Sequence, residues 1–384
     1  MTVNLATDLL RSSKRLIIKI GSALVTDIAQ GTLRLEWLES LAKDIKSLND
    51  KEIIIVSSGA IALGRTPLNI NLQTSAKDLK IEQKQAAASI GQITLINGFL
   101  EKFSEQGLRV SQILLNPKDT ENRRTHLNAR ATLNTLLQHN IIPVINENDT
   151  TATDEIRFGD NDKLAARVAQ MMEADLLLIL STTDGLYTAN PQEDPKAEHI
   201  PVVQEISKDI LLMAREVTSG VSTGGMKSKM EAAQIAVDAG TNVVISSGKD
   251  MNSIQKILEE EQKSTLLLAK DTPHSARKRW IAAHLKTSGK IVIDDGAINA
   301  LFSGKSLLPV GVTDIIGKFE RGDAVEIQNS QKEAIAIGLT AYQSEEAKKI
   351  KGCHSKEISE TLGYIGRDVL IHRNDMVLMK DGKV

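Results

Sequence analysis

The sequence predicts an α/β fold: a three-layer αβα sandwich around a mostly parallel sheet, followed by a small β-rich domain. Over residues 15–268, short apolar runs alternate with longer segments of helical period, which is typical of parallel strands joined by helices. From about residue 290 the runs shorten and glycines separate them, as in small barrels or sandwiches. We therefore expect a first domain over 1–270, a linker over 271–287 and a β-rich domain over 288–384.

Six apolar runs are the strand candidates of the first domain. Each is rich in Ile, Leu and Val, as strands buried on both faces of a sheet should be. The strand candidates are residues 16–20, 53–56, 110–115, 141–145, 176–180 and 243–246. Segments with apolar residues at helical spacing are expected to cover the sheet, and these are 35–48, 85–103, 126–137, 163–172 and 226–239. In the second domain, the strand candidates are 291–293, 324–328, 334–339 and 368–371.

Composition excludes several classes of function. The chain has 384 residues, of which 41% are hydrophobic, and its net charge of −2 gives no global attraction to nucleic acid or to an anionic membrane. Cys353 is the single cysteine, and the seven histidines show no metal-ligand spacing, so no protein-bound metal is expected. The first 14 residues contain no long apolar region, so we expect no signal peptide and a cytoplasmic protein.

Polar motifs follow the strand candidates, at the carboxyl edge where open α/β sheets bind ligands. The first strand ends in Lys19-Ile-Gly21-Ser22: the lysine can reach a phosphate, and the glycine lets backbone amides approach an anion. A strand-end lysine that only reaches solvent explains Lys19 equally well. The second strand runs into Ser57-Ser58-Gly59-Ala60, whose small residues expose amides to an anion or form an ordinary helix cap.

The fourth strand candidate is followed by the motif richest in amide and carboxylate groups. Asn146-Glu147-Asn148-Asp149 comes directly after residue 145, and Gly159-Asp-Asn161-Asp162 follows one loop later. These side chains offer hydrogen-bond donors for an acidic substrate and acceptors for its ammonium group, so an amino acid would suit the site. A capped, Asx-rich turn is the alternative.

Two further motifs point to a nucleotide. Ser222-Thr223-Gly224-Gly225-Met226-Lys227-Ser228-Lys229 opens a helix with paired glycines, which bare amide donors, and a lysine one turn on can neutralise a phosphate. Its spacing differs from that of a P-loop. The segment 181–191 follows the strand 176–180 and lies on the same edge of the sheet. A glycine loop and a turn-rich loop without ligands remain the alternatives.

Taken together, these motifs and Gly185-Leu-Tyr-Thr resemble the amino acid kinase family, and within it the members that phosphorylate glutamate. Ser306-Leu-Leu-Pro-Val-Gly311 and Phe319-Glu-Arg-Gly-Asp323 in the tail look like the PUA domain that many of these kinases carry. The resemblance covers nearly the whole chain. It implies transfer of a phosphoryl group from ATP to L-glutamate, with Mg2+, to give L-glutamyl 5-phosphate in proline biosynthesis.

The resemblance also implies roles for individual residues. Lys19, Asp162 and Lys229 would be catalytic, with the lysines on the phosphoryl group and Asp162 orienting them. Glutamate would be bound by Ser58, Gly59, Ala60, Asp149 and Asn161. ATP would be bound by Lys19, Gly21, Ser181, Thr182 and the residues Thr223, Gly224, Gly225, Met226, Lys227, Ser228 and Lys229. The chain has Ser181-Thr182 where the family has a Thr-Asp pair. Proline as inhibitor, a homodimer or homotetramer, and hand-off to glutamyl phosphate reductase are further implications.

Three alternatives stay open at this point. Acetylglutamate, aspartate, carbamate and nucleoside-monophosphate kinases share the outline of these motifs. PUA domains also occur in RNA-modifying enzymes, but residues 290–384 carry 13 Lys and Arg against 14 Asp and Glu, without the surplus of a phosphate-backbone binder. A non-catalytic amino-acid sensor is the third alternative, and the presence of both lysines and Asp162 argues against it.

Overall fold

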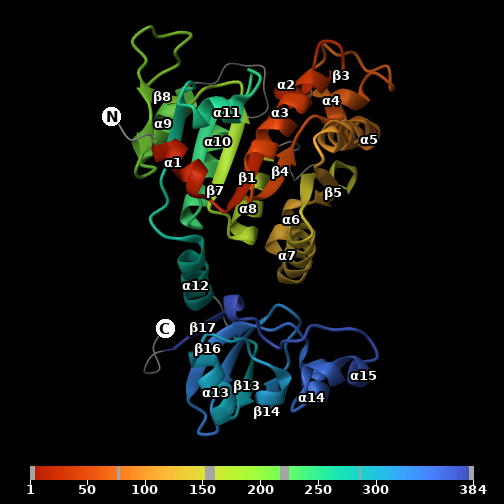
Figure 1. The fold of residues 1–384 in the computed structure, drawn as a ribbon, viewed down its shortest axis with the longest axis vertical. Coiled ribbons are helices and arrows are strands. Elements are labelled where there is room, and N and C mark those ends of the chain that lie inside the picture. Colours follow the sequence, from red (N-terminus) through yellow and green to blue (C-terminus); the bar gives the residue numbers. More distant parts are fainter. Residues whose placement is uncertain (1–4, 76–77, 152–160, 217–224, 285–286, 380–384) are drawn as a thin grey trace. The chain divides into compact units, whose positions relative to one another are not determined.

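The computed structural model describes residues 5–75, 78–151, 161–216, 225–284 and 287–379 (Figure 1). The chain forms two compact units, the first from Met1–Glu121 and Asn128–Pro273, the second from Asn122–Leu127 and His274–Val384. Each unit has its own sheet. Among the described residues, no helix combines the length and the apolar character needed to cross a membrane.

The first unit is built on an eight-stranded sheet in the order β10-β12-β11-β7-β1-β4-β6-β5. Neighbouring strands are parallel except β11 and β12. The mostly parallel sheet is therefore confirmed, and each of the six expected runs forms a strand. The strands are β1 (Arg15–Ile20), β4 (Glu52–Ser57), β5 (Arg109–Leu115), β6 (Ile141–Glu147), β7 (Leu176–Ser181), β10 (Val202–Val203), β11 (Asn242–Ser247) and β12 (Ser264–Leu267).

Helices cover both faces of this sheet and create two cores. Successive strand residues alternate between the cores: Ile18 belongs to one, and Ile17 to the other. The first core is closed by α1 (Leu5–Ser12), α3 (Leu35–Ser47), α5 (Ile81–Glu105) and α11 (Ser253–Leu258). The second is closed by α7 (Arg123–Gln138), α8 (Asn161–Met172), α9 (Lys208–Glu216) and α10 (Met226–Asp238). This arrangement confirms the three-layer sandwich and the expected helices.

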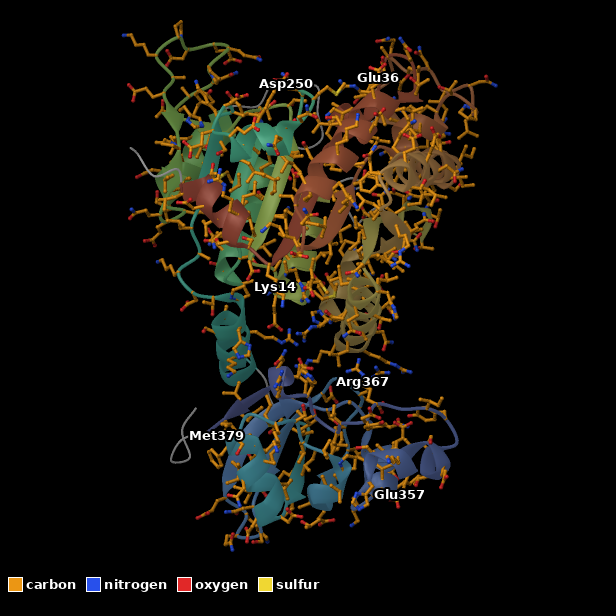
Figure 2. The ribbon with its side chains drawn as sticks, viewed as in Figure 1. Lys14, Glu36, Asp250, Glu357, Arg367 and Met379 are labelled. Atoms are coloured by element: carbon orange, nitrogen blue, oxygen red, sulfur yellow. The ribbon has the colours of Figure 1, made fainter. Side chains whose placement is uncertain are left out.

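Strand order places the functional edge at the centre of the sheet. The strand β4 lies on one side of β1 and β7 on the other, so the chain changes direction beside β1. Crevices for ligands form at such a switch point, outside the carboxyl ends of the strands. Figure 2 shows Lys14 at the amino end of β1, and Glu36 and Asp250 toward the opposite, carboxyl edge of the same unit.

Several short elements lie at the carboxyl edge of the sheet, and one of them, α4, packs unusually closely against α5. They are α2 (Ser22–Val25), β2 (Thr26–Asp27), β3 (Thr32–Leu33), α4 (Ala60–Gly64), α6 (Pro117–Glu121), β8 (Leu186–Tyr187) and β9 (His199–Ile200). A Cβ on Gly91 of α5 would lie 1.9 Å from the carbonyl oxygen of Ala60. A Cβ on Gly64 would lie 1.8 Å from that of Ala87. Glycine at both positions therefore lets the backbones of α4 and α5 touch.

The second unit contains a five-stranded mixed sheet in the order β14-β13-β15-β16-β17. The pair β13 and β15 is parallel and the others are antiparallel. Its core includes Ile291, Val325 and Tyr342. The strands are β13 (Gly289–Ile293), β14 (Val312–Gly317), β15 (Ala324–Gln328), β16 (Ala334–Leu339) and β17 (Met376–Leu378), and the helices are α12 (Pro273–His284), α13 (Asp295–Phe302), α14 (Ser344–Ile350) and α15 (Ile358–Leu362).

One expectation for this part of the chain, a strand over residues 368–371, needs correction. Residues 368–371 are not a strand, because only Ile371 forms a bridge, to Leu307. The backbone of Leu370 is shared between two segments: its N–H donates to Leu307 and its carbonyl accepts from Ala341. The stretch 271–287, expected to be a linker, contains α12, which begins at Pro273, where the fixed φ of proline is favourable. The domain limits derived from the sequence stay predictions.

Candidate active site

Two lysines and an aspartate form a buried ion triad at the carboxyl edge of the sheet. The ammonium Nζ of Lys19 lies 2.6 Å from Oδ1 of Asp162, and Nζ of Lys229 lies 3.2 Å from Oδ2. The three side chains are 7%, 2% and 7% exposed for Lys19, Asp162 and Lys229. Burial alone would raise the pKa of Asp162, but the two ammonium groups and their hydrogen bonds outweigh it and lower the pKa.

The elements that hold the triad explain why these residues meet. Lys19 is the fifth residue of β1 and follows Ile17 on the strand face that carries the second core. Asp162 lies in the first turn of α8, where the helix dipole favours an anion. Lys229 lies in the first turn of α10, after Gly225 as N-cap. Because α8 and α10 cover the same face of the sheet and contact each other, both reach the end of β1.

A chain of amide side chains lies beside the triad. The amide nitrogen of Asn161 is 2.8 Å from the carbonyl oxygen of Ser57, 2.9 Å from Oγ of Ser58 and 2.8 Å from Oδ1 of Asn146. The amide nitrogen of Asn146 in turn donates to Oε1 of Gln92, at 2.7 Å. We call Gln92, Asn146 and Asn161 the amide relay. It links α5, β6 and α8, and it holds Asn161 against the turn that follows β4.

A buried carboxylate, that of Asp149, lies close to this relay in the sequence. Asp149 begins the short 3-10 helix Asp149–Thr151 and is 7% exposed. Burial, followed by the nearby charge of Glu147, raises the pKa of Asp149 to about 7. Within the described parts of the chain, Oδ1 of Asp149 and Oδ1 of Asn161 have no hydrogen-bond donor. Both oxygens are buried hydrogen-bond acceptors.

The turn after β4 is shaped by a glycine. Gly59 has a φ of 115°, in the left-handed region that favours glycine, and a Cβ there would lie 2.8 Å from Cγ2 of Thr26. The turn exposes Ser58 to Asn161 and leads directly into α4 at Ala60. Ser58 therefore lies beside Asn161, and Gly59 and Ala60 follow Ser58 directly in the chain.

Only some of the residues that are expected to bind ATP lie close to one another in the structure. Ser181 ends β7, and its Oγ accepts a hydrogen bond from the N–H of Thr183, while Thr182 is exposed. Gly21 donates its N–H to the carbonyl of Leu180, so this amide joins β1 to β7 and is not free for a phosphate. These residues all lie at the carboxyl ends of β1 and β7, close in the sheet to Lys19.

The glycine-rich motif before α10 is described only in its second half. Met226 is buried, and Ser228 lies in the first turn of α10. Nζ of Lys227 lies 3.9 Å from Oε1 of Glu231. Thr223 and Gly224 fall outside the described residues, and so does Gly159 before α8. The described part places Lys229 in the triad.

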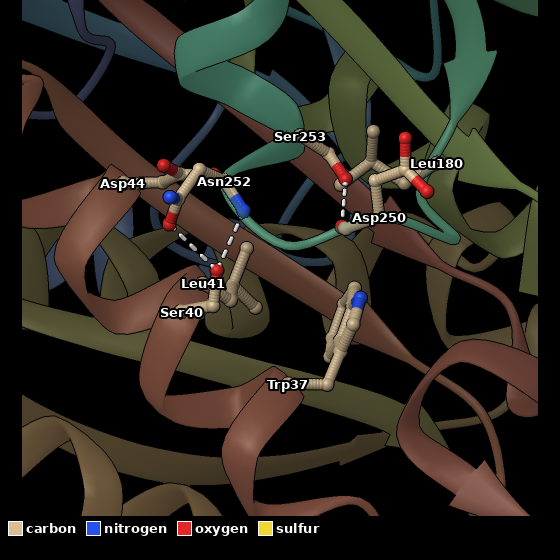
Figure 3. Close-up of a pocket in the computed structure, with 8 residues that line it drawn as sticks. All are labelled: Trp37, Ser40, Leu41, Asp44, Leu180, Asp250, Asn252 and Ser253. Atoms are coloured by element: carbon tan, nitrogen blue, oxygen red, sulfur yellow. Dashed lines mark hydrogen bonds between the residues drawn. The ribbon is translucent and has the colours of Figure 1, made fainter.

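The loop after β11 is tied to α3 at the same edge (Figure 3). Nε1 of Trp37 donates to the carbonyl of Gly248 at 2.7 Å, and the N–H of Asn252 donates to Oγ of Ser40 at 2.6 Å. Oδ2 of Asp44 accepts from the N–H of Ile254 at 2.9 Å. Burial raises the pKa of Asp44 to about 6, although backbone hydrogen bonds oppose the shift. This loop is therefore held by side chains of α3.

Reasoning from sequence missed one residue of the site and left two unassigned. Gln92 lies in a helix that was read only as a cover for the sheet. The available signal was a glutamine directly after Gly91, on the helix face formed by Ala87, Ala88 and Gly91. Asn146 and Glu147 belong to the polar motif after β6, but their contacts could not be foreseen from spacing.

Comparisons with known proteins show which family the chain belongs to. A model of the amino acid kinase family matches residues 14–247. A glutamate 5-kinase from Bartonella henselae is 51% identical over 367 residues, which cover 95% of each chain. A glutamate 5-kinase from Brucella anthropi is 50% identical over 371 residues, covering 96% of this chain and 97% of that one. The chain belongs to the amino acid kinase family, in the glutamate 5-kinase branch.

The second unit also has a family match. A PUA domain model matches residues 289–362, a segment that contains β13 to β16. Among solved structures, a carbamate kinase from Giardia lamblia bound to AMP-PNP is 13% identical, with a TM-score of 0.47, and covers 68% of this chain and 100% of that one. The family membership rests on the sequence matches, which span both units.

Proposed function

We propose that the protein transfers the γ-phosphoryl group of ATP to the side-chain carboxylate of L-glutamate, giving L-glutamyl 5-phosphate and ADP. This is the first step of proline biosynthesis. The observation that carries the proposal is the buried triad of Lys19, Asp162 and Lys229 at the switch point of the sheet. The glutamate 5-kinase relatives, at about half identity over nearly the full chain, support glutamate as the substrate.

Electrostatics explains why the triad suits this reaction. The acceptor carboxylate and the polyphosphate repel each other, so cations must lie on both sides of the moving phosphoryl group. Lys19 and Lys229 approach Asp162 from two different elements, and each can contact an oxygen of that group. In this proposal, Asp162 holds the two ammonium groups at a fixed separation.

No general base is required. A glutamate side chain has a pKa of about 4.3 and is already ionised at neutral pH. Asp162 is poorly suited to accept a proton, because its two lysines lower its pKa. Asp162 therefore acts as an organiser of charge, and the reaction depends on position and charge compensation.

Substrate binding is assigned to the relay side of the site. Asp149 and Asn161 present the buried acceptors for the substrate ammonium, and Ser58 lies beside Asn161. Gly59 and Ala60 complete the turn that would receive a carboxylate. Ser181, Thr182 and the residues from Gly225 to Lys229 are proposed to contact ATP, with Lys19 on its phosphates.

Mg2+ is proposed to arrive with ATP. No group of three or more His, Cys, Asp or Glu side chains placed to hold a metal occurs in the described parts of the chain. Mg2+ is commonly bound by substrate phosphates and water with only one or two carboxylates, so a protein cage is not needed. The ion would neutralise phosphate charge in addition to the two lysines.

The deciding experiment is an activity assay that traps the acyl phosphate as its hydroxamate. L-Glutamate, N-acetylglutamate, aspartate, carbamate and UMP are compared at equal concentration, with ADP release as a second readout. We expect hydroxamate and ADP only with L-glutamate. Faster ADP release with any of the other four substrates would refute glutamate as the substrate.

Regulation and assembly complete the proposal. We expect proline to inhibit by competing with glutamate, a homodimer or homotetramer, hand-off of the unstable product to glutamyl phosphate reductase, and a cytoplasmic location, where ATP is supplied. The helix α5 supports self-association, because it exposes Ile93 (63%) and Leu100 (54%), two apolar side chains seven residues apart on one face. Unchanged activity when proline is added at low glutamate would remove the regulatory part.

A further inference from the structure

We propose that Gln92, on α5, is a positioning residue that fixes the side chain of Asn161 through Asn146. This inference rests on the proposed function, because its effect is measured as the binding of glutamate. Gln92 is 8% exposed, and its Oε1 lies 2.7 Å from Nδ2 of Asn146. Gln92 contacts neither lysine of the triad by any hydrogen bond or ion pair found among the described residues.

Two backbone groups set the direction of the amide relay. The N–H of Glu147 donates to Oδ1 of Asn146 at 2.9 Å, so Nδ2 must be the end that faces Gln92. The carbonyl of Ser57 accepts from Nδ2 of Asn161 at 2.8 Å, so the same nitrogen also meets Oδ1 of Asn146. Since neither backbone group can reverse its role, Asn146 needs an acceptor at the position of Gln92 Oε1.

The other end of the Gln92 amide offsets much of the stability that its hydrogen bond to Asn146 provides. Its nitrogen Nε2 is buried and has no acceptor within the described residues. A buried donor without a partner is costly. A methionine of similar shape would remove this donor but would leave Nδ2 of Asn146 without its acceptor, so the two costs roughly offset each other. What glutamine supplies at this position is the acceptor for Asn146, and thereby the orientation of Asn161.

Close packing of α5 against α4 places Gln92 where it can accept the hydrogen bond from Asn146. Its neighbour Gly91 lets the backbone of α5 approach the carbonyl of Ala60, in the turn that carries Ser58. The helix therefore touches the proposed glutamate site at two adjacent positions: Gly91 against the turn after β4, and Gln92 against Asn146 of β6. Asn161 is then clamped between Ser58 and Asn146.

The test exchanges Gln92→Met and measures the KM of glutamate, the KM of ATP and thermal unfolding. Loss of one buried hydrogen bond to the relay is expected to raise the KM of glutamate about 5- to 10-fold. The KM of ATP should stay within about 2-fold, and the unfolding temperature should not fall. Gln106→Met, the same exchange at the C-cap of α5, is the matched control and should leave all three values unchanged.

A second variant separates positioning from direct binding. Asn146→Leu removes the middle of the relay, so adding Gln92→Met to it should raise the KM of glutamate no further. An additional increase as large as that of the single exchange would overturn the inference, and so would an unchanged KM or a lower unfolding temperature in Gln92→Met. A wild-type protein with no activity on glutamate would instead refute the proposed function, before any variant is measured.

Discussion

Two buried aspartates of the first unit respond to burial in opposite ways. Asp162 lies between two ammonium groups and has a lowered pKa, whereas Asp149 lies near Glu147 and has a pKa raised to about 7. Both side chains are less than a tenth exposed. The difference teaches that burial alone does not set the charge state of a site. Asp162 is already paired with two lysines of the protein, whereas Oδ1 of Asp149 has no hydrogen-bond partner among the described residues, which supports the proposed contact with the substrate ammonium.

The largest effect on turnover is expected when Asp162, the aspartate that lies between two lysines, loses its charge. Asp162→Asn removes the charge that holds Lys19 and Lys229, so turnover should fall about 10²- to 10³-fold or more. Leaving two buried lysines without their counter-ion should also cost about 3–5 kcal/mol of unfolding free energy. Steady-state assays and chemical denaturation measure the two effects.

The lysines can be tested separately from the aspartate. Lys19→Ala and Lys229→Ala should each lower turnover by orders of magnitude with the fold retained. Lys43→Ala, which removes an exposed lysine that pairs with Glu39 on α3, is the control. Near-normal turnover in either triad variant would exclude that lysine from the phosphoryl-transfer step.

The exchange Asp149→Asn tests the other aspartate, which is proposed to bind the ammonium group of glutamate. Loss of the carboxylate charge that would pair with the ammonium should raise the KM of glutamate about 30-fold, equivalent to about 2 kcal/mol, with turnover changed only a few-fold. Glutarate lacks the ammonium group, so its inhibition constant should be the same for the wild type and the variant. A glutamate KM that stays at the wild-type value would show that Asp149 does not bind the ammonium.

Much of this comparison could be predicted from the sequence, because strand ends are visible in it. Lys19 lies near the end of one run of apolar residues and Asp149 follows another closely, and the parallel sheet brings such ends together. Asp162 comes one loop after Asp149, in the first turn of α8. Strand ends do not reveal a side chain that reaches the site from a helix beside the sheet. The contact of Gln92 with Asn146 depends on the approach of α5 to α4 through Gly91 and Gly64, and no spacing along the chain encodes that approach.

The second unit shows another limit. Residues 324–328 and 334–339 are apolar enough to be recognised, and they form β15 and β16 as expected. The edge strand β17 has only three residues, and the segment 368–371 divides its backbone hydrogen bonds between two neighbours instead of joining a ladder. Short edge pairings are decided by tertiary contacts, which the local pattern does not contain.

The charge of Asp149 gives a pH-dependent prediction that sharpens the comparison. With a pKa of about 7, Asp149 loses its charge as the pH falls below 7, and the ammonium then binds less well. The value of kcat/KM for glutamate should therefore decrease by up to about 10-fold per pH unit below pH 7. Asp162 stays ionised in this range because its pKa is lowered. In Asp149→Asn the decrease should disappear, and a profile that persists in the variant would assign it to another group.

The smallest effect is expected at Asp44, a buried carboxylate with a raised pKa but a structural partner. Its oxygen accepts from the N–H of Ile254, and its pKa of about 6 lies above the ordinary value of 3.8. Because the folded protein holds this proton more tightly, the stability contributed by Asp44 is fully present below pH 4 and is lost as the pH rises through 6.

Asp44→Asn should therefore flatten the dependence of unfolding free energy on pH between 4 and 7, by about 1–3 kcal/mol in total. Denaturation of wild type and variant at several pH values measures the difference. The KM of glutamate should not change, since Asp44 lies on α3 and contacts the first turn of α11. A raised KM here would mean that a high pKa in this unit does not distinguish the substrate-binding carboxylate from the structural one.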